Sequence, residues 1–124
     1  MIQHLLLAED DPDIRLVSKT ALKRAGYRVT VAANGREALE CVAADRPDAI
    51  LLDYMMPEID GAETCRRLKA DPATRDIPIV FLTAKSHGFQ LEEAKQIGAV
   101  GYIVKPYDAL TLGARVKAIL EGAQ

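Results

Sequence analysis

The segment from Ala49 to Pro57 constrains the fold more than any other part of the chain. Three aliphatic residues, 50–52, lead directly into Asp53, and a proline follows four positions later. A short, uninterrupted apolar run is typical of a strand buried on both faces of a parallel sheet. The strand must end before Pro57, since proline cannot donate a hydrogen bond to a sheet. Asp53 is therefore expected at the carboxyl end of a buried strand, where open α/β sheets carry their chemistry.

Length and charge narrow the class of protein. The 124 residues suffice for one domain with a substantial core. A net charge of −2 supplies no field for nucleic acid, so we expect no direct nucleic-acid binding. No apolar run approaches the ~20 residues of a membrane span, and the start has no basic region leading to a signal-peptide cleavage site. Two cysteines do not make a disulfide framework, and we expect a cytoplasmic protein without membrane contact.

Strand and helix patterns alternate along the whole chain. Apolar runs predict strands at 3–8, 27–32, 49–53, 77–82 and 102–104. Helical spacing, with capping residues and terminal glycines, predicts helices that begin after Asp11, Asn34 and Asp60, a weaker one at 89–97, and a last one from Asp108 to Gly122. Strands alternating with helices predict a parallel sheet covered on both faces.

The expected fold is therefore a doubly wound, flavodoxin-like α/β sandwich. Its five parallel strands take the order 2-1-3-4-5, in which strands 1 and 3 flank the switch point. The acids after these two strands then become neighbours. The chain shows no linker or repeat and ends soon after the last helix, so we expect one domain over 1–124 and no output domain.

Polar residues that could carry chemistry follow four of the strands: Glu9, Asp10, Asp53, Thr83 and Lys105. Adjacent carboxylates repel one another unless a cation relieves them. Mg²⁺, or Mn²⁺ in its place, binds carboxylates, waters and phosphate oxygens. A lysine beside the acids would neutralise a transferred phosphoryl group, and an aspartate can form an aspartyl phosphate.

Each of these residues also has an ordinary explanation. Acids at a helix start stabilise the helix dipole, and we prefer that explanation for Asp11 and Asp13. Thr83 could be a turn or helix cap, and Lys105 could be a solvated charge. An ordinary structural role can explain each residue singly, but it explains less well why all of them lie at one edge of the sheet.

Four motifs in register carry a family resemblance: Leu5–Asp11, Leu51–Pro57 followed by Asp60–Gly61, Phe81–Ala84, and Gly98–Ala99 with Lys105–Pro106. With them the whole chain resembles a receiver domain of the two-component response regulators, the family of the bacterial chemotaxis regulator. Thr83 and Lys105 follow Asp53 by 30 and 52 residues, which agrees with the family.

The resemblance implies a role for each matching position. Asp53 resembles the phosphoacceptor, which takes a phosphoryl group from a phosphohistidine on a kinase or a histidine phosphotransfer protein. Asp10, Asp53 and the backbone carbonyl of Met55 are implied to bind Mg²⁺ directly, and Glu9 through water. Lys105 is implied to contact the phosphoryl oxygens. Such a protein is a switch that catalyses its own phosphorylation and dephosphorylation rather than an enzyme.

Thr83 and Tyr102 resemble the pair of residues that switches on phosphorylation. The threonine hydroxyl is implied to turn toward the phosphoryl group and the tyrosine to fill the space it leaves. Tyr102 could also be an ordinary half-buried strand aromatic. The surface of helix 4, strand 5 and helix 5 would then be read by a downstream protein or output domain. The resemblance also implies a cis Lys105–Pro106 peptide bond.

Two further positions are expected to tune rate or partner choice. Met55 and Lys85 lie two residues after Asp53 and Thr83, where an attacking water must pass, and the apolar Met55 cannot orient that water. Val100 and Gly101 stand where many transcriptional receivers have an acidic pair, which leaves an apolar patch in place of a charged dimer contact.

The sequence is also compared with three alternative functions. A haloacid-dehalogenase-like phosphatase would use the Asp11-Pro12-Asp13 pattern, but no late acidic pair completes its metal site. A flavodoxin would cradle phosphate in its first loop, which here is acidic and would repel it. A receiver-like module used only for binding would not need the intact set of acids, threonine and lysine.

Overall fold

Five strands alternate with five helices in this computed structural model, which describes residues 2–84 and 91–122. The strands are β1 (His4–Ala8), β2 (Arg28–Ala32), β3 (Ala49–Asp53), β4 (Ile79–Ala84) and β5 (Gly101–Lys105). The helices are α1 (Pro12–Arg24), α2 (Gly35–Ala44), α3 (Gly61–Ala70), α4 (Leu91–Ile97) and α5 (Ala109–Gly122).

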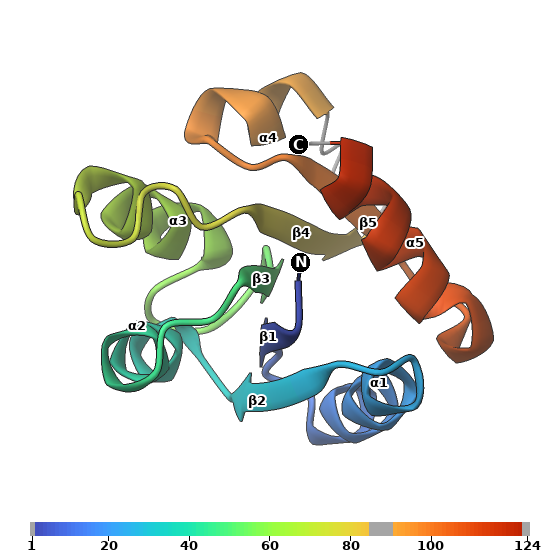
Figure 1. The fold of residues 1–124 in the computed structure, drawn as a ribbon. Coiled ribbons are helices and arrows are strands. Elements are labelled where there is room, and N and C mark those ends of the chain that lie inside the picture. Colours follow the sequence, from blue (N-terminus) through green and yellow to red (C-terminus); the bar gives the residue numbers. More distant parts are fainter. Residues whose placement is uncertain (1, 85–90, 123–124) are drawn as a thin grey trace.

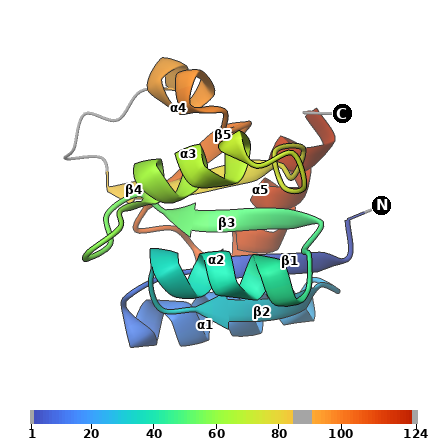
Figure 2. The same ribbon diagram turned by 90° about the vertical axis from the view of Figure 1, so that its left-hand side faces the viewer.

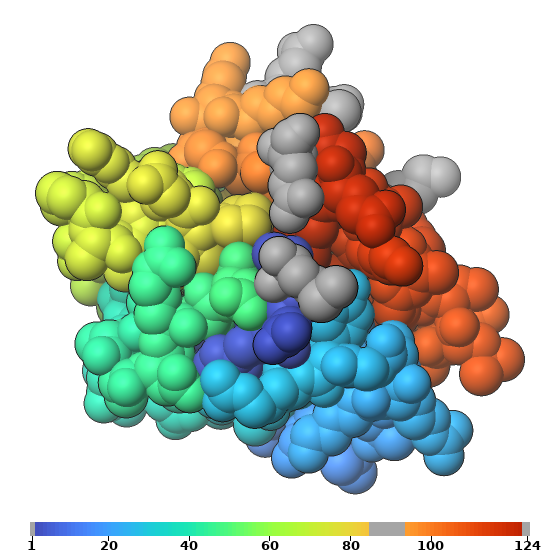
Figure 3. Space-filling model, in the orientation of Figure 1, coloured from blue at the N-terminus to red at the C-terminus, as the bar shows by residue number. Residues whose placement is uncertain are grey.

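The strands form one parallel sheet in the order β2-β1-β3-β4-β5, which confirms the predicted topology. Helices α1 and α5 cover one face of this sheet, and α2, α3 and α4 cover the other (Figures 1 and 2). The space-filling view shows the dark blue amino-terminal segment near the middle of one face, between green and red parts of the chain (Figure 3).

Side chains from alternate strand positions fill two separate cores. Leu6, Ile50 and Phe81 belong to the core beneath α2, α3 and α4. Leu7 and Leu51 belong to the core beneath α1 and α5. All five residues of β3 are buried, because both faces of this central strand are covered. The continuous apolar run that predicted this strand thus has a direct physical cause.

The ends of the helices follow the predicted chemistry. Asp11 caps α1, and its side chain accepts hydrogen bonds from the backbone N–H groups of Asp13 and Ile14. Gly26 and Gly98 follow α1 and α4 with φ angles of +103° and +108°, a region that favours glycine. The helix-capping explanation for Asp11 is therefore confirmed.

The fourth strand lies at 79–84 rather than the predicted 77–82. Pro78 has no N–H to donate, and its carbonyl accepts from the backbone N–H of Ile50 just before the ladder begins. Thr83 consequently lies inside β4 rather than after it. The predicted start of the fourth helix, at 89–90, lies outside the described residues.

Among the helices of the described ranges, none has the length and apolar character needed to cross a membrane.

Candidate functional site

Three charged side chains meet at the carboxyl edge of the sheet. Glu9 follows β1, Asp53 ends β3 and Lys105 ends β5. Side chains alternate along a strand, so Asp53 lies on the same side of the sheet as Leu51, and Lys105 on the same side as Ile103. Both of these apolar residues belong to the core beneath α1 and α5. The strand order brings the three charged ends together, as predicted.

Lys105 is bonded to both acids. Its Nζ lies 2.8 Å from each carboxylate oxygen of Glu9 and 3.0 Å from Oδ2 of Asp53. The exposed fractions of the side chains are 18% for Lys105, 5% for Asp53 and 0% for Glu9. Acidic groups buried this deeply need partners, and the partly buried ammonium of Lys105 serves both of them here.

A third carboxylate completes a group of metal-type ligands. Glu9, Asp10 and Asp53 each offer an oxygen atom, and these three atoms lie within 4.8 Å of one another. The backbone N–H of Met55 also lies 3.3 Å from Oδ1 of Asp53, so the Met55 backbone adjoins the cluster. An all-oxygen donor set with several acids suits Mg²⁺ or Mn²⁺, so the residues fit the implied ion.

The electrostatics of the cluster also favour a cation. Burial, together with the nearby Asp53, raises the pKa of Glu9 to about 8. Burial and Asp53 likewise raise the pKa of Asp10. Burial disfavours the charged form of Lys105, but its contacts with Glu9 and Asp53 outweigh this, and its pKa is raised. One lysine contacts two of the three acids, and a divalent ion would favour the ionised forms of all three.

Thr83 and Tyr102 lie on adjacent strands and on the same face of the sheet. Phe81 pairs with Tyr102 in the parallel register, and Thr83 follows Phe81 by two residues. Thr83 is 2% exposed, and its hydroxyl lies 3.5 Å from the Ala84 carbonyl oxygen, which is a long contact. Tyr102 packs partly buried against the core beneath α2, α3 and α4. The arrangement is compatible with the predicted switch pair, whose roles stay predictions.

Two further residues, Arg15 and Gly61, lie against the backbone of the acidic residues. Arg15 on α1 donates from Nη1 to the backbone carbonyl of Glu9 at 2.9 Å. Gly61 begins α3 so close to β3 that a Cβ there would collide with the backbone oxygen of Asp53. Gly61 belongs to the sequence motifs, whereas Arg15 was not predicted, because no spacing rule shows which backbone group a long side chain will reach.

The Lys105–Pro106 peptide bond is cis, as the resemblance implied. Met55 is 51% exposed beside Asp53. Lys85, the other predicted rate-tuning residue, lies outside the described residues.

Comparison with known proteins identifies the family. The model of the response regulator receiver domain matches residues 5–117, so the chain belongs to the receiver domains of two-component response regulators. Aspartate phosphorylation and magnesium are standard for this family.

Particular relatives agree with this assignment. The chain is 42% identical to the transcriptional regulatory protein AfsQ1 of Streptomyces coelicolor over 94% of its own length and 50% of that protein. It is 41% identical to the phosphate regulon transcriptional regulatory protein PhoB of Pseudomonas aeruginosa, over 94% and 51%. It thus spans about half the length of these curated relatives. The structure of the chemotaxis response regulator CheY4 of Vibrio cholerae matches with a TM-score of 0.87 at 32% identity, covering 96% of this chain and 99% of that one.

Proposed function

We propose that Asp53 is the phosphoacceptor of this receiver domain and takes its phosphoryl group from a phosphohistidine. The observation that carries the proposal is the contact of one partly buried lysine with two of three clustered acids. Asp53 is the member of the cluster that ends the central strand β3. A carboxylate oxygen of Asp53 would attack phosphorus while the phosphorus–nitrogen bond to the donor imidazole breaks.

The other residues of the cluster would stabilise charge. Asp10, Asp53 and the Met55 carbonyl would hold Mg²⁺ directly, with Glu9 acting through water. The bound ion would screen the acids from the incoming phosphoryl oxygens. Lys105 would move part of its hydrogen bonding from Glu9 to those oxygens, which keeps a partly buried cation paired throughout.

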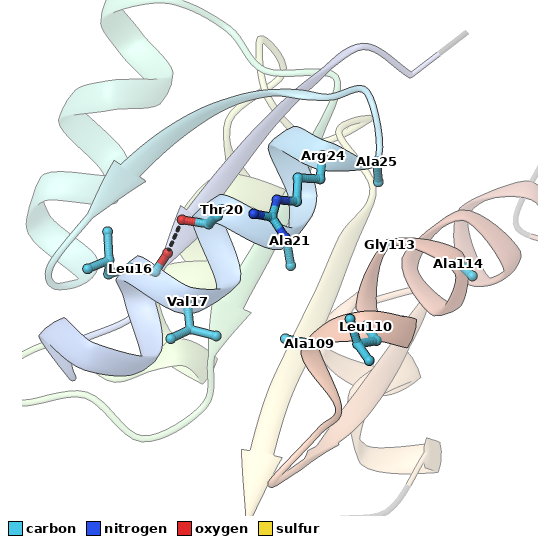
Figure 4. A pocket seen from close by; sticks show the side chains of 10 residues that line it. All are labelled: Leu16, Val17, Thr20, Ala21, Arg24, Ala25, Ala109, Leu110, Gly113 and Ala114. Atoms are coloured by element: carbon cyan, nitrogen blue, oxygen red, sulfur yellow. Dashed lines mark hydrogen bonds between the residues drawn. The ribbon is translucent and has the colours of Figure 1, made fainter.

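The phosphodonor protein would dock beside this site. Leu16 and Val17 of α1 are 63% and 54% exposed, and Leu110 of α5 is 90% exposed. Figure 4 shows these side chains along a groove of about 540 Å³ between the two helices. A second hollow shares Val17 with this groove and reaches Lys105. Exposed apolar surface that leads to the acceptor suits the kinase or phosphotransfer protein that carries the phosphohistidine.

The downstream partner would use the opposite side of α5. A hollow of about 580 Å³ lies between α4, β5 and α5, and Val100, Gly101 and Tyr102 line it. If Thr83 turns toward the phosphoryl group, Tyr102 would move inward and change the shape of this hollow. A downstream protein or output domain would then bind the altered face. Apart from Lys95 of α4 the lining carries no charge, so we expect mainly apolar contacts there.

Intact mass after incubation with acetyl phosphate and Mg²⁺ tests the phosphoacceptor. We expect one phosphoryl group on the unmodified protein, none on Asp53→Ala, and none when Mg²⁺ is omitted. Asp13→Ala is the matched control, because Asp13 is an exposed acid outside the cluster, and it should be phosphorylated normally. No adduct on the unmodified protein, with Mg²⁺ bound, would favour a module used only for binding.

A further inference from the structure

A hydrogen bond between two distant hydroxyl groups lies next to the proposed site. The hydroxyl of Tyr107, two residues after Lys105, lies 2.7 Å from Oγ of Ser18 on α1. The two residues are 89 positions apart, and Ser18 is 1% exposed. Buried hydroxyls that pair in this way fix the relative position of the segments that carry them.

This bond anchors the chain just beyond the lysine. Lys105 is the last residue of β5 to pair with β4, opposite Ala84. Pro106 follows and cannot donate a backbone hydrogen bond, and the side chain of Tyr107, the next residue, bonds to Ser18. Pairing with β4 therefore fixes the backbone of Lys105, and the bond between Tyr107 and Ser18 fixes the chain two residues later.

Helix α1 contacts both halves of the site with one face. Arg15 and Ser18 are three residues apart, which places them on the same side of a helix. Arg15 donates to the carbonyl of Glu9 on the acidic half, and Ser18 bonds to Tyr107 behind the lysine half. The distance between Glu9 and the ammonium of Lys105 thus depends on the position of α1 relative to the sheet.

We propose that Ser18 and Tyr107 form a positioning pair, which holds Lys105 where it can stabilise the phosphoryl group in transfer to Asp53. The inference rests on the proposed function, and it adds residues that touch neither the ion nor the phosphoryl group. Small displacements of a catalytic group are costly, so loss of the bond lowers the rate of transfer. Burial raises the pKa of Tyr107, so its hydroxyl stays protonated at neutral pH and the bond persists.

Tyr107→Phe and Ser18→Ala test the pair, with acetyl phosphate as the donor and saturating Mg²⁺. Each variant should be phosphorylated roughly three- to tenfold more slowly, and the double variant no more slowly than the worse single one, because all three lose one hydrogen bond. The dissociation constant for Mg²⁺ should change less than twofold. Tyr27→Phe is the matched control, because Tyr27 precedes β2 at the other edge of the sheet, and its rate should not change.

Tyr107→Phe made in a Lys105→Arg protein separates a positioning role from a general loss of structure. Lys105→Arg keeps a positive charge but cannot place a single ammonium nitrogen where lysine has it. In this background Tyr107→Phe should change the rate less than twofold. An equal reduction in both backgrounds, or no reduction with lysine present, would refute the positioning role. Absence of any phosphorylation on the unmodified protein would instead refute the proposed function.

Discussion

The raised pKa of Glu9 predicts that Mg²⁺ binding releases a proton. Glu9 is buried beside Asp53, and its pKa rises from an ordinary value of 4.5 to about 8. A divalent cation favours the ionised carboxylate, so the proton must leave when the ion binds. Asp10, whose pKa burial also raises, contributes with the same sign. Affinity for Mg²⁺ should therefore fall as the pH falls.

The size of this effect follows from the pKa. With a pKa of about 8, Glu9 holds its proton in most metal-free molecules at pH 7, so up to about one proton is released per ion bound. Between pH 7 and pH 6 the dissociation constant should rise about tenfold, and well above pH 8 it should level off. The metal-free native state holds this proton up to about pH 8, whereas the unfolded state loses it near 4.5. The stability of the metal-free protein should thus fall as pH rises from about 5 to 8.

Calorimetric titration of Mg²⁺ in two buffers with different ionisation enthalpies measures the proton release directly. The same titrations at pH 6, 7, 8 and 9 give the change in affinity. Glu9→Gln keeps the shape of the side chain but cannot ionise, and it should lose most of the proton release. A dissociation constant that is constant from pH 6 to 8, without proton release at pH 7, would refute the reasoning.

Three further substitutions have defined outcomes. Gly61→Ala should lower the melting temperature and weaken Mg²⁺ binding, because the new Cβ would meet Tyr54 Cα at 2.8 Å; Gly122→Ala, with open space around it, is the control, and equal behaviour of the two would contradict this. Met55→Asn should speed loss of the phosphoryl group, measured by intact mass over time, because an amide can orient the attacking water; equal or slower loss would remove the idea. Lys105→Ala should slow phosphorylation roughly a hundredfold but tighten Mg²⁺ binding, since a competing cation leaves the carboxylates. Weaker Mg²⁺ binding in this variant would show that the lysine organises the acids rather than competing for them.

The sequence patterns were sufficient to predict the sheet and the edge of the sheet at which the site lies. Strand β3 is buried on both faces, so its apolar run is unbroken and Asp53 stands out at its end. The parallel order then required the acids after β1 and β3 to be neighbours. These predictions depend on periodicity and topology, which the sequence carries directly.

Contacts made by individual side chains were not predictable in the same way. The resemblance implied that Glu9 serves the ion and Lys105 the phosphoryl group, but in the structure these two residues bond to each other. The bond between Ser18 and Tyr107 depends on how α1 packs near α5, and helical spacing gives a face but not the atoms that meet across it. The start of β4 lies later than predicted because Pro78 has no N–H to donate to the ladder, although its carbonyl accepts from Ile50.

The hydrogen bond between Lys105 and Glu9 joins residues that are 96 positions apart. During synthesis, the acids of the first and third strands emerge long before the lysine that balances them. A nascent chain that ends before residue 105 would have these acids without the lysine, and we expect it to accept no phosphoryl group at a useful rate. We therefore expect that the domain can be phosphorylated only after the last strand has joined the sheet. Incompletely synthesised chains would not be phosphorylated.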